Sequence, residues 1–206
     1  MDAWQQLFPK TEGTRYIAGM SRNIILASAS PRRRDLLLKH GFTVEVLPSD
    51  APEMMPDFLT VGEMTLLNAR IKAHQVTRAR PESLVLAADT LVALDGRALG
   101  KPAGFNEAFE MLSMLSGRTH EVFTGVWLEH RAARKERGFI AMTQVTFRKM
   151  KPAEIREYIA RVNPLDKAGA YAAQQNEMGL IEAVEGSHSN VVGLPMEHLL
   201  AVLEEF

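Results

Sequence analysis

The sequence contains no cysteine, which excludes disulfide bonds, thiolate metal sites and cysteine nucleophiles from its 206 residues. An excess of charge of one sign is also lacking, because 24 Lys and Arg side chains stand against 25 Asp and Glu. This balance gives no reason to expect a nucleic-acid polymer or an anionic membrane as a partner. Any anion site must therefore be local.

Long apolar runs are missing as well. The early apolar run at residues 24–29 is too short to cross a bilayer. Residues 1–20 lack the basic start and apolar core of a secretion signal, so we expect a cytoplasmic protein. Regular patterns begin only after Ser21, which predicts an N-terminal extension at residues 1–20 and a single domain at residues 21–206.

The remaining pattern alternates strands with helices. Residues 23–29 form an apolar run typical of a buried strand, and Ser30 and Pro31 then favour the start of a helix that ends at Gly41. Residues 60–80 open with Thr60 and Glu63, the pair of a capping box. Their apolar stripe is predicted to contain Met64, Leu67 and Ile71.

A second apolar run, at residues 84–94, predicts a long strand that ends in the hairpin signal Asp95-Gly96. A helix is expected after Asn106, and we assign its residues Met111, Leu112, Met114 and Leu115 to the core. Further strands are expected at 42–46, 120–130 and 139–147, and further helices at 151–162 and 195–206. The fold class is therefore α/β, with a mixed sheet and flanking helices.

Two arginines occupy an unusual place at the start of the first helix. Arg32 and Arg33 lie in its first turns, where a cation opposes the helix dipole and an acidic residue is usual. Their presence suggests a bound anion, most simply a phosphate, although a solvated surface cluster explains them equally well. Neither a P-loop nor a dinucleotide-binding fingerprint occurs in the sequence.

Asp89 stands in the middle of the apolar run 84–94. An ionised carboxylate there must lie at a strand edge, pair with a cation or bind a metal, because burying it alone costs several kcal/mol. A turn at the strand end is the alternative, but the apolar pattern resumes directly after Thr90. We therefore interpret Asp89 as a functional residue at a ligand cleft.

Candidate partners for Asp89 occur on both sides of it in the sequence. Lys72 falls beside the apolar stripe of its helix, and Lys101 sits between a glycine and a proline after the hairpin. Glu53, in a Pro-rich stretch, is a candidate second metal-binding carboxylate. Taken singly, each of these three also reads as an ordinary solvated residue.

Several other chemistries have no matching motif. The six histidines include no H-E-x-x-H pattern, which disfavours a zinc protease. No G-x-S-x-G or S-x-x-K pattern occurs, so a serine hydrolase has no visible nucleophile.

Eight short motifs occur in a fixed order from residue 24 onward, and together they closely resemble the Maf-type nucleoside triphosphate pyrophosphatases. They are "LASASPRR", "LNARIKA", "LAADT", "GKP", "LSGRTHEVFTGV", "VTF", "PLDKAGAYAAQ" and "VVGLP". The resemblance implies an ITPase-like or Maf-like fold, in which a twisted mixed sheet forms two lobes around a central cleft. It also suggests a homodimer.

The activity implied by this resemblance is cleavage of a nucleoside triphosphate between its α and β phosphates with a divalent metal, Mg²⁺ or Mn²⁺. The site residues carried over onto this sequence fall into three groups. Asp89, Lys72 and Lys101 would be catalytic. Glu53 and Asp89 would hold the metal. Ser28, Arg32, Arg33, Thr90 and Gln174 would bind substrate.

The motifs "SPRR" and "DKAGAY" mark the branch of the family that acts on dTTP and UTP. Arg32, Thr90 and Gln174 are the specificity set that this branch implies, since a glutamine amide pairs with the donor and acceptor edge of a pyrimidine base. The alternatives are a 7-methyl-GTP pyrophosphatase of the same family and a nucleotide-binding regulator of cell division with little turnover. Nucleic-acid binding through "PRRR" and "RAARKER" is weaker, because acidic residues are interspersed.

Overall fold

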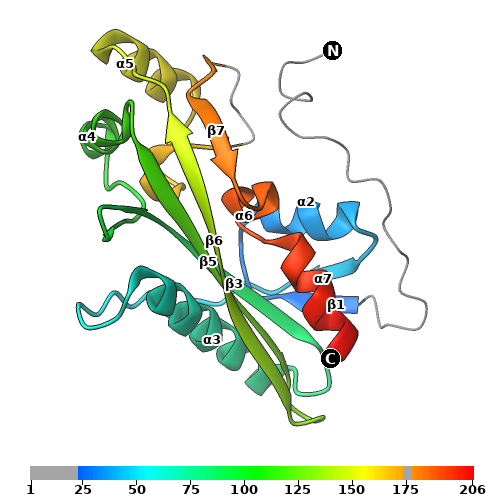
Figure 1. Cartoon of the computed structure of the whole chain (residues 1–206). Helices are drawn as coiled ribbons and strands as arrows, with labels where there is room; N and C mark the ends of the chain where they lie inside the picture. Colours follow the sequence, from blue (N-terminus) through cyan, green and yellow to red (C-terminus); the bar gives the residue numbers. More distant parts are fainter. Residues whose placement is uncertain (1–22, 174–177) are drawn as a thin grey trace.

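A twisted, mixed β-sheet runs through the computed structural model, with helices on both sides (Figure 1). The structure describes residues 23–173 and 178–206, and the predicted extension at residues 1–20 lies outside these ranges. The strands are β1 (Asn23–Leu26), β2 (Thr43–Val46), β3 (Val85–Leu94), β4 (Arg97–Leu99), β5 (Thr119–His130), β6 (Lys135–Phe147) and β7 (Ile181–Glu185). The helices are α2 (Pro31–Lys39), α3 (Val61–Ala79), α4 (Phe105–Leu115), α5 (Pro152–Arg161), α6 (His188–Val192) and α7 (Met196–Glu205), with a 3₁₀ helix η1 (Ala168–Ala170).

The strand order places a gap beside the middle of β3. The sheet runs β2-β1-β3-β5-β6-β7, with β1 parallel to its neighbours and the other pairs antiparallel. Because β5 pairs with one edge of β3, strands β1 and β4 share the other edge. The β1 pairing reaches Leu86 and the β4 pairing begins at Val92, so neither of these two strands covers the edge between them. The mixed α/β sheet predicted from the sequence is thus confirmed.

Local sequence signals place several element ends as predicted. Asp95 and Gly96 have φ values of 52° and 76°, the two positive angles that a two-residue type I′ hairpin requires. Thr60 and Glu63 form the expected capping box at the start of α3. The prediction for α4 was wrong by two residues, because Gly104 is its N-cap and Asn106 already lies inside the helix.

Two large apolar clusters fill the space along the sheet. One lies around β1, α2 and α7, and the other around α4, α5 and η1, which agrees with the two expected lobes. Met111, Leu112 and Leu115 belong to the second cluster as predicted. Met114 does not, because 45% of it is exposed on the outer face of α4.

Helix α3 packs directly on β3 and β5, and this packing positions the site. A Cβ atom at Gly125 would lie 2.3 Å from the α3 backbone at Leu66, so only glycine permits this approach. Met64 is buried as predicted, whereas Leu67 and Ile71 are only half-buried. They are half-buried because the small residues Ala69 and Ala73, together with Val76, face the sheet in their place.

Within residues 23–173 and 178–206, no helix combines the length and the apolar character that a membrane span requires.

Candidate active site

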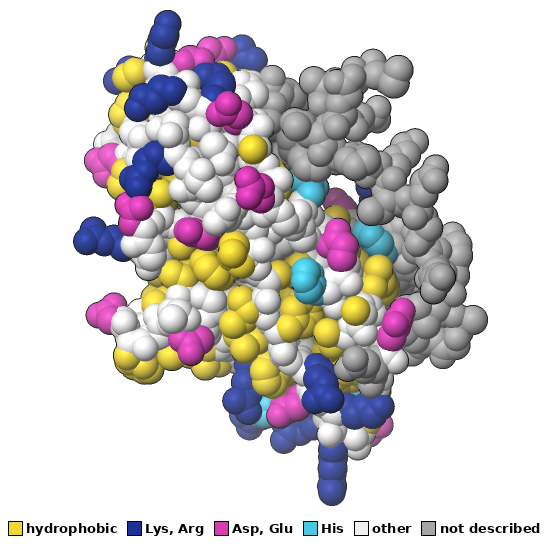
Figure 2. Space-filling model, viewed as in Figure 1, with side chains coloured by type: hydrophobic (Ala, Val, Ile, Leu, Met, Phe, Trp, Pro, Cys, Tyr) yellow, Lys and Arg dark blue, Asp and Glu magenta, His cyan; other side chains and the backbone are white. Residues whose placement is uncertain are grey.

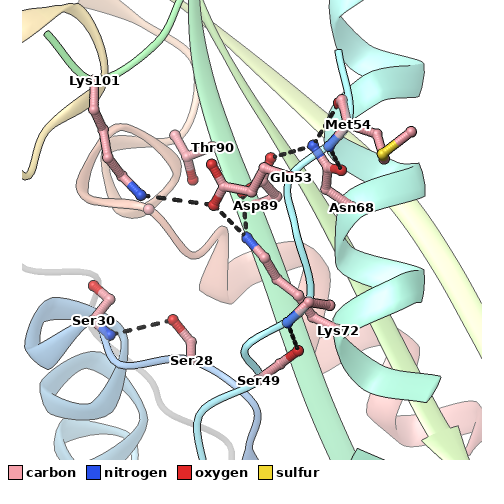
Figure 3. Close-up of polar contacts among 12 residues, drawn as sticks. Ser28, Ser30, Ser49, Glu53, Met54, Asn68, Lys72, Asp89, Thr90 and Lys101 are labelled. Carbon is pink, nitrogen blue, oxygen red and sulfur yellow. Dashed lines mark hydrogen bonds and ion pairs between the residues drawn. The ribbon is translucent and has the colours of Figure 1, made fainter. Parts of the chain in front are cut away.

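A cleft of about 570 Å³ opens at the uncovered edge of β3, where β1 ends and α2 begins. A ligand cleft beyond the carboxyl end of a strand, where the strand order changes, is the usual arrangement in open α/β sheets. The lining includes Ser28, Arg33, Glu53, Lys72, Asp89 and Lys101. Figure 3 shows several of these residues: Asp89 lies on β3 and Lys72 on α3, whereas Ser28, Glu53 and Lys101 lie in the loops after β1, β2 and β4.

Asp89 points from β3 toward α3. Side chains alternate along a strand, so Asp89 shares its face of the sheet with Ala87 and Leu91, which belong to clusters that α3 covers. Only 5% of Asp89 is exposed. Its Oδ1 accepts a hydrogen bond from Lys72 Nζ at 2.7 Å, and its Oδ2 accepts one from Asn68 Nδ2 at 3.1 Å. These two donors offset the cost of burying the carboxylate.

Lys72 joins Asp89 to a second carboxylate. Its Nζ is also 2.7 Å from Glu53 Oε1, and its side chain is only 11% exposed. Lys101 lies 3.6 Å from the same Glu53 oxygen, but 56% of its side chain is exposed (Figure 3). Burial opposes the ionisation of Glu53, yet the hydrogen bond from Lys72 and the charges of Lys72 and Lys101 lower its pKa below the ordinary value.

Arg33 is half-buried in the lining of the cleft and contacts three separate segments. Its Nε donates to the Gly193 carbonyl at 2.8 Å, its Nη1 to Ser28 Oγ at 2.9 Å, and its Nη2 to Thr90 Oγ1 at 3.0 Å. Burial lowers the pKa of its guanidinium, although the nearby charge of Asp89 opposes this shift. Arg33 therefore connects α2, β3 and the end of α6, in addition to placing positive charge at the cleft.

Arg32 bridges the two sides of the cleft. Its Nη1 lies 3.2 Å from Asp166 Oδ2, across 134 residues of sequence. Burial alone would raise the pKa of Asp166, but the hydrogen bonds from Lys167 and Arg32 lower it below the ordinary value. All three side chains line the cleft.

The structure thus brings together the site residues expected from the sequence that it describes. Glu53, Lys72, Asp89 and Lys101 form one connected cluster, and Ser28, Arg33 and Thr90 form a second one beside it. Gln174 lies outside the described residues. Asn68, Asp166 and Lys167 were not predicted. Asn68 stands four residues before Lys72, a helical spacing that could have indicated it.

The two carboxylates suit a hard divalent cation. Within the described part of the chain, no group of three or more His, Asp or Glu side chains is placed to hold a metal ion. Mg²⁺ needs no such cage, because it is commonly bound by one or two carboxylates together with substrate phosphates and water. Glu53 and Asp89 converge on one point, Lys72 Nζ, and could therefore provide two such carboxylates.

The wall of the cleft on the side of η1 is apolar and rests on a buried histidine. Tyr171 and Val122 line this wall, and the Tyr171 hydroxyl lies 2.9 Å from His120 Nε2. His120 is fully buried, and its ring packs edge-on against Phe147 at a centroid distance of 4.8 Å. Burial lowers the pKa of His120 from its ordinary value of 6.5 to about 4.

This shift predicts a loss of stability in mild acid. Below pH 6.5 the unfolded chain takes up a proton at His120, whereas the folded chain does not until about pH 4, so the free energy of unfolding falls as the pH falls through this window. Between pH 7 and pH 5 the contribution of His120 is expected to fall by about 2 kcal/mol. Urea unfolding of the wild type and of His120→Phe at both pH values measures it. The change in the variant should be smaller by that amount, and equal changes would contradict the assignment.

The two basic stretches do not form one surface. Arg32, Arg33 and Arg34 belong to the first turn of α2, whereas the stretch around Arg134 forms the turn between β5 and β6, at the far tip of that hairpin (Figure 1). Acidic and basic side chains are interspersed over much of the face shown in Figure 2. The guanidinium of Arg33 is also engaged by Ser28, Thr90 and Gly193, and this arrangement disfavours the nucleic-acid alternative.

Comparison with known proteins supports the family resemblance that the sequence motifs indicated. A family model described as "Maf-like protein" matches residues 23–206. The dTTP/UTP pyrophosphatase of Pelotomaculum thermopropionicum is 43% identical over 185 residues, which cover 90% of this chain and 97% of that protein. The dTTP/UTP pyrophosphatase of Myxococcus xanthus is 46% identical over 181 residues, 88% of this chain and 91% of that protein.

Among solved structures, the Staphylococcus aureus Ham1 protein aligns with a TM-score of 0.48 and 18% identity. The alignment covers 89% of this chain and 98% of that one. A HAM1 protein from Coxiella burnetii gives a TM-score of 0.48 and 17% identity, with 89% and 99% covered.

Proposed function

This chain belongs to the Maf-like protein family, and from that premise we propose that it is a pyrophosphatase that hydrolyses dTTP or UTP to the monophosphate and pyrophosphate. The relatives that carry this activity in their names match nearly the whole described chain. The observation that supports the proposal most strongly is the cluster of the buried Asp89 with Lys72 and Glu53 at the uncovered edge of β3.

In the proposed reaction, Asp89 orients and deprotonates the water that attacks the α-phosphorus. It is a suitable acceptor because Lys72 and Asn68 fix both of its oxygens inside the cleft. Lys72 and Lys101 offset the negative charge that develops on the phosphates, which a pyrophosphatase must stabilise in the transition state. The proton then leaves from Asp89 to solvent once the two products have separated.

A divalent cation, Mg²⁺ or Mn²⁺, would be held by Glu53 and Asp89. When bound, it supplies positive charge against the triphosphate. Lys72 contacts both carboxylates at 2.7 Å, so it balances their charge in the absence of the cation and is directed at the phosphates in its presence.

Substrate binding is assigned to Ser28, Arg32, Arg33 and Thr90 on the α2 side of the cleft. We place the base against the apolar wall of Tyr171 and Val122, because a pyrimidine ring can replace water there. Gln174 follows this wall in the sequence and remains the proposed partner of the base edge.

The remaining parts of the proposal concern the whole chain. We assign catalysis to a single domain at residues 21–206 and treat residues 1–20 as an extension. A cytoplasmic location and assembly into a homodimer complete the proposal. The expected partner is a small nucleotide, with neither nucleic acid nor membrane.

A panel of triphosphates tests the proposed function. The purified chain is incubated with Mg²⁺ and each of dTTP, UTP, CTP, GTP and 7-methyl-GTP, and released pyrophosphate is measured. We expect fastest release from dTTP and UTP. Fastest release from 7-methyl-GTP would move the chain to the other branch of the family, and binding of dTTP without turnover would favour the regulator instead.

A further inference from the structure

Asn68 lies beneath the carboxylate cluster, and its contact with Asp89 is only one of the three hydrogen bonds that its side chain makes. It is on α3, one turn before Lys72, and only 2% of it is exposed. Figure 3 shows its amide between Asp89 on β3 and Met54 in the loop that carries Glu53. It therefore contacts both segments that supply a carboxylate.

Both N–H hydrogens and the oxygen of the Asn68 amide form hydrogen bonds with these two segments. Its Oδ1 accepts from the Met54 backbone N–H at 2.7 Å, and its Nδ2 donates to the Met54 carbonyl at 3.0 Å. The second hydrogen of Nδ2 serves Asp89 Oδ2 at 3.1 Å. This pattern also fixes which end of the amide is which, because a backbone N–H requires an oxygen and a carboxylate requires a donor.

The hydrogen bond from Asn68, together with the one from Lys72, fixes the plane of the Asp89 carboxylate. Lys72 holds Oδ1 and Asn68 holds Oδ2, and these two residues stand on one rigid helix at a spacing of four. With one donor removed, the carboxylate could rotate about its side-chain bond while keeping its contact with Lys72. A proton acceptor that must face one water molecule loses efficiency when its orientation is not fixed.

The hydrogen bonds between Asn68 and the Met54 backbone hold the loop that carries Glu53. Glu53 precedes Met54, whose backbone N–H and C=O both pair with the Asn68 amide. The same loop is attached to α3 a second time, where Gln75 accepts from the Ala51 N–H at 3.2 Å. Between these two attachments, Glu53 is held within 2.7 Å of Lys72 and 3.6 Å of Lys101.

We propose that Asn68 is a positioning residue, which sets the distance and orientation of Asp89 relative to Glu53 so that the two carboxylates can share one divalent cation. The inference rests on the proposed function and deepens it. Partners that orient metal ligands typically change metal affinity or activity by about 10- to 100-fold when they are removed. A buried asparagine that only satisfies the backbone would change stability alone.

The first test compares Asn68→Ala with Thr77→Ala. Thr77 is a fully buried polar residue on the same helix, two and a half turns away, and its hydroxyl donates to the His74 carbonyl at 3.1 Å. For Asn68→Ala we expect kcat at saturating Mg²⁺ to fall at least about tenfold, with KM for dTTP changed by less than about threefold. The dissociation constant of Mn²⁺ alone, measured by electron paramagnetic resonance, should rise about tenfold. Thr77→Ala should change neither.

A second variant, Asn68→Asp, separates the acceptor contact of Asn68 from its two donor contacts. Aspartate keeps an acceptor for the Met54 N–H but places an oxygen, instead of a donor, opposite both Asp89 Oδ2 and the Met54 carbonyl. Hydrogen exchange at the Met54 amide should therefore stay slow, as in the wild type, while kcat falls at least about tenfold. In Asn68→Ala the same amide should exchange faster. If Asn68→Ala does not fold, Asn68→Asp still decides the question.

Two outcomes would overturn the inference. One is a kcat of both Asn68 variants within about twofold of Thr77→Ala, and the other is an unchanged Mn²⁺ dissociation constant in Asn68→Ala. Failure of the proposed function is distinguishable, because the wild type would then release no pyrophosphate from any triphosphate. In that case, Mn²⁺ binding and exchange at Met54 still decide whether Asn68 positions the two carboxylates.

Discussion

Replacing Asp89 by asparagine is expected to lower the rate of pyrophosphate release from dTTP by at least about a thousandfold. The amide cannot accept the proton of the attacking water, and it carries no charge with which to hold a cation. The asparagine side chain also cannot accept both of the hydrogen bonds that Asp89 accepts. Both oxygens of Asp89 accept hydrogen bonds, from Lys72 and Asn68, whereas asparagine has one oxygen and must turn its NH₂ toward one of these donors.

The measurement is kcat at saturating dTTP and Mg²⁺ for the wild type, Asp89→Asn and a matched control. Asp95→Asn is the control, because Asp95 is an exposed hairpin carboxylate that pairs with Arg118, and its φ of 52° is one that asparagine readily adopts. The control should turn over dTTP at the wild-type rate. A kcat for Asp89→Asn within tenfold of the wild type would remove Asp89 from the reaction.

Replacing Lys72 by methionine is expected to lower kcat/KM for dTTP by about a hundredfold or more. The variant keeps the length and packing of the side chain but removes the charge that lies nearest to both carboxylates. A second effect should run in the opposite direction. Since Lys72 and a metal ion compete for Glu53 and Asp89, the variant should bind Mn²⁺ several-fold more tightly than the wild type in the absence of nucleotide.

Two further lysine and arginine variants serve as comparisons for Lys72→Met. Lys101→Met should have a smaller effect on kcat/KM, because Lys101 is more exposed and, among the described residues, forms an ion pair with Glu53 alone, at 3.6 Å. Arg78→Met removes an exposed charge from the last turn of the same helix and should change neither quantity. Weaker Mn²⁺ binding by Lys72→Met would contradict the competition, and wild-type kcat/KM would contradict its role on the phosphates.

Short-range signals allowed much of the fold to be predicted. Asp95-Gly96 and the pair Thr60 and Glu63 act through their own backbone, so sequence alone identified the hairpin and the start of α3. Met114 was misassigned to the core because the exposed and buried faces of α4 both carry methionine. Helix α6, of five residues, was not predicted, since such a short helix gives no periodic pattern.

The charged centre of the site was also predictable, because a carboxylate inside an apolar strand requires a cation or a metal, whatever the fold. The residue pairs that contact each other across the cleft could not be predicted from the sequence. Arg32 on α2 pairs with Asp166, which is 134 residues away in the sequence. Asn68 on α3 pairs with Met54, which lies in a loop without a regular sequence pattern. Arg33 was expected to bind phosphate, but its contacts with Ser28, Thr90 and Gly193 add a structural role that no motif indicated.

The proposed reaction depends on attack of water at the α-phosphorus, and labelled water tests this step most directly. The wild type is allowed to hydrolyse dTTP with Mg²⁺ in H₂¹⁸O, and both products are analysed by mass spectrometry. Attack at the α-phosphorus should leave one ¹⁸O atom in dTMP and none in pyrophosphate. Label in pyrophosphate, or release of orthophosphate with label, would place the attack on another phosphorus and contradict it.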